Sequence, residues 1–141
     1  NNSRKLLEAL WNLDSDKVAA GVDKAHEEIS ILQYNDENSL SCTISLAFYF
    51  AREYYTVIRE LPSGKGFADI CFLPRKLHLD KPAAIIELKW NKNASGAIAQ
   101  IKRQQYSEVL KDYHGDLLLA SINYDKKTKL HECVIEKFQK Y

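Results

Sequence analysis

Residues 83–90, AAIIELKW, place a carboxylate and an ammonium inside an apolar run near the middle of the chain. The length of this run and its β-branched and aromatic residues predict a strand, whose side chains alternate between two faces. Glu87 and Lys89 therefore share one face with Ile85, and we expect this polar face to line a cleft. The other face can pack on helices and carries Ala84, Ile86 and Leu88. Any fold that holds this strand must cover one face and give the charges of the other face a partner.

A second carboxylate, Asp69, interrupts the apolar run at residues 67–73. Burying a carboxylate without a partner is costly, and two carboxylates about 4 Å apart repel each other by about 4 kcal/mol at an effective dielectric of roughly 20. A divalent cation removes both penalties. Asp69 precedes Glu87 by 18 residues, which is enough for two neighbouring strands and their connection. These hard oxygen ligands suit Mg²⁺ or Mn²⁺, beside which Lys89 could orient the attacking water or stabilise a pentavalent phosphate.

The hydrophobic pattern changes its period near residue 55. Upstream, apolar residues recur at helical spacing and predict three helices, over residues 3–12, 15–30 and 36–54. Downstream, β-branched and aromatic runs predict five strands, and apolar positions within residues 95–113 predict a helix between the third strand and the fourth. A helix between two strands indicates a crossover, so we expect a mixed sheet with one parallel pair. The predicted strands are residues 55–60, 67–73, 83–90, 116–124 and 129–138.

Composition limits the class of protein. The chain has 141 residues, of which 45% are apolar and 28% charged, and this is ordinary for one globular domain. Its 20 basic and 19 acidic residues give a net charge of +1, so no global basic field indicates nucleic acid, although a local basic patch is compatible with these counts. Three cysteines without disulfide or CxxC spacing favour a cytoplasmic protein, and no apolar run reaches the roughly 18 residues of a membrane span.

Asp69, an interval of 18 residues and then Glu87-Leu88-Lys89 resemble the motif of the PD-(D/E)XK nuclease superfamily. The predicted order α-β-β-β-α-β over residues 36–124 is similar to the core of that family. The closer resemblance is to the bacterial subfamily in which such a domain follows an AAA-like ATPase domain. The stretches that carry it are Asn35 to Asn38, Ser63 to Asp69, Ile86 to Lys89, and Ala97 to Ile101 followed by Tyr106.

The resemblance implies a restriction-endonuclease-like α/β (α+β) fold, in which a central mixed sheet is flanked by helices and preceded by extra N-terminal helices. We therefore expect residues 1–34 to form an N-terminal helical extension and residues 35–141 to form the nuclease-like domain, both within a single compact unit. The missing initiator methionine indicates a fragment of a longer protein.

The resemblance also implies roles for individual residues. Asp69 and Glu87 would be metal ligands, and Lys89 would be the catalytic lysine. Glu37 matches a further acidic position that many members use on the metal or its water, so it is a candidate catalytic residue and metal ligand. The weaker candidates for contact with substrate are Gln100, Lys65 and Glu60.

Each candidate also has a structural interpretation, and the motif is not complete. Ala68 stands before Asp69 in place of Pro, and the Gln-x-x-x-Tyr signature of some nuclease subfamilies is absent because Lys102 stands four residues before Tyr106. The structural interpretations are a salt pair on an exposed sheet surface for Glu87 and Lys89, a turn cap or a pair with Arg75 for Asp69, a charge favoured by the helix dipole for Glu37, and surface or packing positions for Glu60 and Gln100.

The sequence thus predicts a metal-dependent nuclease that hydrolyses the phosphodiester bonds of nucleic acid, DNA in particular, with Mg²⁺ or Mn²⁺. The alternative is a nuclease-like domain that no longer cuts and serves as a binding module for an AAA-like ATPase domain of the same chain. The expected partners are nucleic acid and that ATPase domain. A homodimer is compatible with the resemblance, and no membrane partner is expected.

Overall fold

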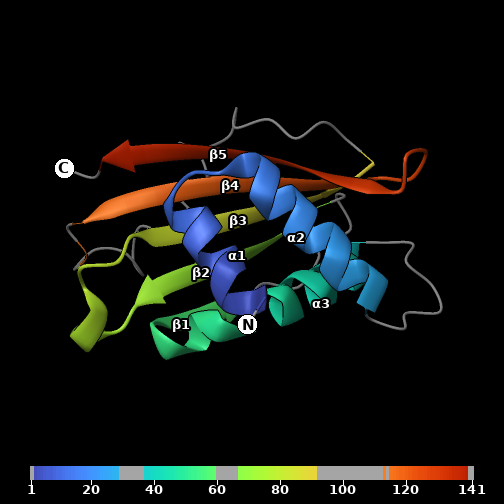
Figure 1. Ribbon diagram of the computed structural model, residues 1–141. Helices are drawn as coiled ribbons and strands as arrows, with labels where there is room; N and C mark the ends of the chain where they lie inside the picture. The colour runs from blue at the N-terminus through green and yellow to red at the C-terminus, as the bar shows by residue number, and fades with distance from the viewer. Residues whose placement is uncertain (1, 29–36, 60–66, 92–112, 114, 140–141) are drawn as a thin grey trace.

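The chain folds around a five-stranded mixed sheet whose strands follow one another in space in the order of the sequence. A computed structural model describes residues 2–28, 37–59, 67–91, 113 and 115–139. Neighbouring strands are antiparallel except for β3 and β4, which are parallel, so the predicted mixed sheet with a parallel pair is confirmed. The strands are β1 (Tyr55–Arg59), β2 (Phe67–Pro74), β3 (Ala83–Trp90), β4 (Asp116–Asp125) and β5 (Leu130–Gln139) (Figure 1).

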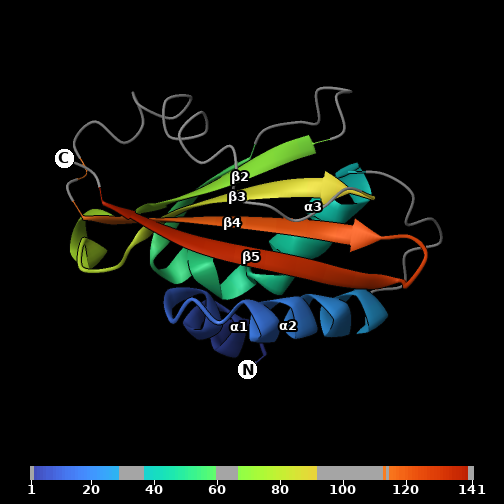
Figure 2. The same ribbon diagram turned by 90° about the horizontal axis from the view of Figure 1, so that it is seen from above.

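Three helices cover one face of the sheet, as the view from above shows (Figure 2). They are α1 (Asn2–Trp11), α2 (Ser15–Glu28) and α3 (Glu37–Ala47). Asp14 caps α2, because its Oδ1 atom accepts a hydrogen bond of 3.1 Å from the backbone N–H of Lys17. None of the helices in the described ranges has both the length and the hydropathy needed to cross a membrane.

The main hydrophobic core lies between these helices and the sheet. The apolar face predicted for β3 packs into it, so that prediction is confirmed. All three helices contribute buried side chains to this one cluster, which stabilises the sheet by removing apolar surface from water. Its buried members include Leu6, Leu10, Val18, Val22, Leu40, Ile44, Phe72, Ala84, Ile86, Leu88, Leu118 and Ile122.

The third helix is shorter than predicted, because α3 ends at Ala47 and a 3₁₀ helix, η1 (Tyr49–Glu53), follows it. The backbone N–H of Phe50 donates to the Ser3 hydroxyl at 2.7 Å, whereas a continuing α-helix would use the carbonyl four residues back. Phe48 is buried at the break, and its ring lies 5.6 Å from that of Phe72. A partner on α1 and a core contact on β2 therefore end the α-helix, and neither is visible in local periodicity.

A carboxylate–imidazole pair joins α2 to the edge strand β5. The Oδ1 atom of Asp23 accepts a hydrogen bond of 2.7 Å from the backbone N–H of His131 and also lies 2.7 Å from the Nδ1 atom of the His131 ring. Burial lowers the pKa of His131 although Asp23 acts to raise it, and burial likewise lowers the pKa of His26, whose ring lies 5.6 Å from that of His131. Both folded-state imidazoles thus favour the neutral form.

We expect the free energy of unfolding to fall as the pH drops through about 6.5, the unfolded pKa of histidine. A lowered folded pKa means that the unfolded chain binds more protons, so stability is present above that pH and is lost below it. Urea unfolding at about pH 8 and about pH 5.5 measures the difference. His131→Asn keeps a side-chain donor beside Asp23 and removes the titration, so its stability should depend less on pH. An equal pH dependence in this variant would contradict the assignment.

Candidate active site

The polar half of β3 lies on the face of the sheet opposite the helices. Glu87 and Lys89 alternate with Ile86 and Leu88, which belong to the core on the helix side. The Glu87 carboxylate is 1% exposed, and the Lys89 ammonium lies 3.2 Å from its Oε1 atom, with 15% of the lysine side chain exposed. Burial of a carboxylate is costly unless the charge is paired, so this ion pair offsets the burial of Glu87. The salt pair of the structural interpretation does form, but it is buried and not on an exposed surface.

An apolar cluster borders this ion pair on the same face, toward the start of β3. Tyr113 closes the cluster: its hydroxyl accepts from the backbone N–H of Ala83 at 3.1 Å and donates to the carbonyl of Asp116 at 2.7 Å. Burial raises the pKa of Tyr113 and keeps it a neutral donor. Apolar surroundings strengthen electrostatic interactions, so the charges of β3 act more strongly here than they would in water. The other buried members are Cys71, Ala83, Ile85, Leu117 and Leu119.

Asp69 lies in β2, directly opposite Glu87 in the antiparallel register. Residues opposed in this way share a face of the sheet, and their Cβ atoms are typically about 4.5–5.5 Å apart. The register therefore puts position 69 on the face that carries Glu87 and Lys89. Two acidic positions and one lysine, separated in sequence, meet on neighbouring strands. The side chain of Asp69 lies outside the described part, and the cleft expected on this face stays a prediction.

Two residues of β4 complete the polar half of this face, and sequence reasoning did not single them out. Ser121 pairs with Glu87 in the parallel register, and Asn123 pairs with Lys89. Both side chains are fully buried although they are polar. The sequence did contain a signal for this polar face of β4. In the run LLLASINYD, Ser121 and Asn123 alternate with apolar residues, as Glu87 and Lys89 do in β3.

Glu37 occupies a different place from the other acidic candidates. It is the first residue of α3, which packs on the helix-covered face through Leu40 and Ile44. The face that carries Glu87 is the opposite one. In Figure 2 the first turn of α3 lies at the end of the sheet where β3 and β4 end. Glu37 thus begins a helix that covers the face opposite the one with Glu87 and Lys89.

The remaining candidates lie outside the described ranges. These are Glu60 and Lys65, within residues 60–66, and Gln100, within residues 92–112. The helix predicted over residues 95–113 also lies outside the described ranges, except for residue 113. Arg75, the alternative partner for Asp69, donates from Nε to the backbone carbonyl of Tyr55 at 3.2 Å.

The donor set on β2 and β3 fits a hard divalent cation. Glu87 offers a carboxylate held in a nearly dry site, and the facing position holds a second acidic residue, Asp69. Carboxylate oxygens are the ligands preferred by Mg²⁺ and Mn²⁺. Among the side chains that the structure describes, which do not include those of Asp69 and Glu37, no group of three or more His, Cys, Asp or Glu is arranged to hold a metal.

Comparison with known proteins identifies the part of the chain that carries this arrangement. A family model described as the PD-(D/E)XK nuclease superfamily matches residues 35–133, well over half of the chain. The match contains β1 to β4 with the three positions Asp69, Glu87 and Lys89, and it begins after α2. No curated protein matches the chain.

Proposed function

Because the chain belongs to the PD-(D/E)XK nuclease superfamily, we propose that it hydrolyses phosphodiester bonds of nucleic acid at the polar half of β3. Members of this superfamily are generally nucleases and usually use divalent metals. The observation that carries the proposal is the buried Glu87 carboxylate, which has the Lys89 ammonium 3.2 Å away and Asp69 directly opposite in the register. A buried acid, a second acid and a lysine on one face are the groups that this chemistry requires.

In the proposed site, Asp69 and Glu87 hold the divalent cation, with Glu37 as a further ligand. When bound, such a cation neutralises charge on the phosphate and supplies a water of lowered pKa. Lys89 donates hydrogen bonds from its ammonium to the attacking water or to a phosphate oxygen, and Glu87 keeps that ammonium in place. Ser121 and Asn123 stand beside the pair in the parallel register of β4, and both side chains are buried.

Glu37 has the weakest support of the three proposed ligands, because α3 covers the other face of the sheet. Its side chain would have to approach the cation around the edge of the sheet where β2 begins and β3 ends. The structural interpretation of Glu37, a first-turn charge favoured by the helix dipole, therefore competes directly with the functional one.

Calorimetric titration with Mn²⁺ tests the ligand set. We expect wild type to bind the ion, and Asp69→Asn and Glu87→Gln each to weaken binding by at least about 100-fold, because each removes a charged ligand. Asp80→Asn is the matched control, since the Asp80 side chain is 71% exposed and pairs with Lys81. Binding of equal strength in wild type and Asp69→Asn, or no binding in either, would count against the metal site.

Cleavage assays on single- and double-stranded DNA and on RNA, with Mg²⁺ or Mn²⁺ and with chelator, test the activity itself. Loss of cleavage in Glu87→Gln supports the nuclease. If the protein binds both metal and nucleic acid but cuts none of these substrates, the alternative of an inactive nuclease-like binding module takes its place.

The finer assignments of the sequence analysis belong to the same proposal. We retain DNA as the preferred substrate, Mg²⁺ or Mn²⁺ as the ion, an AAA-like ATPase domain of the same chain as partner in a bacterial protein, a homodimer as a compatible state, and a cytoplasmic location. The division into residues 1–34 and 35–141 is supported by the family match, which begins at residue 35.

A further inference from the structure

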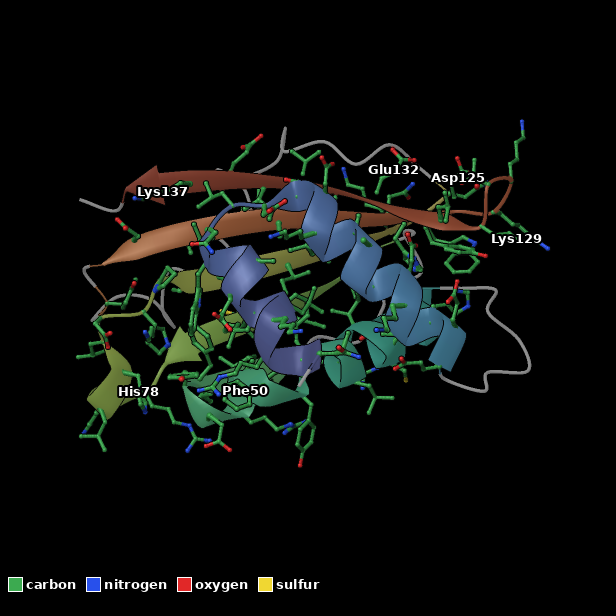
Figure 3. All side chains as sticks on the ribbon, viewed as in Figure 1. Phe50, His78, Asp125, Lys129, Glu132 and Lys137 are labelled. Atoms are coloured by element: carbon green, nitrogen blue, oxygen red, sulfur yellow. The ribbon has the colours of Figure 1, made fainter. Side chains whose placement is uncertain are left out.

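An aromatic pocket of about 400 Å³ lies between α1 and η1, on the helix side of the molecule. Its volume is within the range of roughly 300–1,000 Å³ that is usual for ligand sites. Figure 3 labels Phe50, which forms part of the wall, and His78 of η2 (Lys76–His78), whose ring lies 4.9 Å from that of Tyr54. The aromatic walls are Trp11, Phe50 and Tyr54, and the polar ones are Arg4, Glu8 and Asn12.

The three rings are held in fixed positions. The ring of Tyr54 lies 5.3 Å from that of Trp11 and 5.8 Å from that of Phe50, both in edge-to-face geometry. Trp11 donates from Nε1 to the Tyr55 hydroxyl at 2.8 Å, and this hydroxyl donates to the carbonyl of Pro82 at 2.6 Å. All three wall residues keep part of their surface exposed. The pocket therefore offers preorganised aromatic surface to a ligand.

Two cations lie against these rings. The Arg4 guanidinium is 5.2 Å from the centroid of Phe50, and the Lys81 ammonium is 4.6 Å from the centroid of Trp11 and 5.5 Å from that of Tyr54. All three distances are typical of cation–π pairs. Aromatic surface and positive charge therefore occur together at this pocket. The rings suit a ligand with a flat π-system, and the cations suit an anionic group on the same ligand.

A nucleotide has this combination of groups. Bases stack on aromatic rings and on arginine planes, and phosphates pair with basic side chains. Glu8 and Asn12 offer hydrogen-bond partners to the edge of a base. A paired base inside a duplex cannot enter a pocket of this kind. We propose that the aromatic pocket binds an unpaired base and its phosphate within single-stranded nucleic acid, an inference that rests on the proposed function because it takes nucleic acid as the ligand.

The aromatic pocket is separate from the candidate active site. Pro82, which anchors Tyr55, immediately precedes β3, and Glu87 lies five residues farther on, roughly 17 Å along the strand, on the opposite face. Arg4 and Trp11 belong to α1, which lies outside the family match at residues 35–133. Pocket variants can therefore be made without changing the residues assigned to cleavage.

Binding of a labelled oligothymidylate of about 12 nucleotides, followed by fluorescence anisotropy in chelator, tests the pocket without cleavage. We expect Arg4→Ala and Phe50→Ala each to bind about tenfold more weakly than wild type, which corresponds to the loss of one stacked base. Arg52→Ala is the matched control, because its guanidinium also lies over a ring, 5.4 Å from that of Tyr49, but does not line the pocket. Its affinity should equal that of wild type.

An abasic strand of the same length separates stacking from charge, because it keeps the phosphates and lacks the bases. It should bind more weakly than the oligothymidylate, and a duplex should also bind more weakly. The proposal is overturned if wild type binds no single strand, if Arg4→Ala and Phe50→Ala bind as wild type does, or if the abasic strand or the duplex binds as tightly. Failure of the nuclease proposal would give a different result. Cleavage with metal would be absent, and the pocket variants would still bind the oligothymidylate more weakly than wild type.

Discussion

Lys89→Ala is expected to lower the rate of phosphodiester cleavage about 100- to 1,000-fold, the loss that follows removal of one preorganised electrostatic group from an active site. The ammonium lies 3.2 Å from the Glu87 carboxylate on the polar half of β3, beside an apolar cluster that strengthens its field. The measurement is single-turnover cleavage at saturating Mg²⁺, with Mn²⁺ affinity determined in parallel. We expect metal binding to persist, because both proposed ligands on the sheet remain.

Loss of Lys89 also leaves the buried Glu87 carboxylate without this counter-charge, so a folding defect must be told apart from a chemical one. Removing one partner of a buried pair costs about 3–5 kcal/mol, and less where one partner keeps some exposure to water, as Lys89 does. Lys89→Arg restores the positive charge but not the compact geometry of an ammonium. Recovery of stability without recovery of cleavage would support a role in placing water or phosphate. Cleavage at the wild-type rate in Lys89→Ala would reject the assigned role.

The second large effect concerns stability: Leu10→Ala is expected to lower the free energy of unfolding by about 2–5 kcal/mol. Leu10 lies in α1, is fully buried, and belongs to the cluster that includes Ile86 and Leu88 of β3. Truncation of the leucine leaves a cavity, and the neighbouring side chains of the core lose their contacts with it. Urea unfolding should be a single transition at a lower midpoint, and its slope should not change.

Leu46→Ala is the control for this substitution, because Leu46 is also a helical leucine but is 55% exposed. Its effect should stay within about 0.5 kcal/mol. Fluorescence and far-ultraviolet circular dichroism should report the same transition if α1 and the sheet unfold together. Two separate transitions, with only the first shifted by Leu10→Ala, would show that residues 1–34 fold independently of the sheet.

The strand pattern could be predicted well because alternation on a half-apolar strand is a local property. Residues 83–90 form β3 as predicted, and the side chains of Ile86 and Glu87 lie on the opposite faces that a period of two requires. The strands that carry Asp69 and Glu87 are neighbours, as predicted, and the register that sets the two positions directly opposite each other comes from the structure.

The features that could not be predicted depend on partners far away in the sequence. The end of α3 depends on the hydroxyl of Ser3, and the aromatic pocket depends on rings contributed by both α1 and η1. Ser121 and Asn123 carried a visible alternation, but their place beside the site depends on the register of β4 against β3. Composition and periodicity contain no information about register across a crossover.

The order of the strands has a consequence for how the protein folds. β1, β2 and β3 pair as antiparallel neighbours in sequence, so the two strands with Asp69, Glu87 and Lys89 can pair after closing a short loop. Pairing of β4 with β3 requires closure across residues 91–115, and non-local parallel pairing is intrinsically slow. The acidic and basic groups of the site would thus meet early on the folding pathway, and Ser121 and Asn123 would bury them only in its later step.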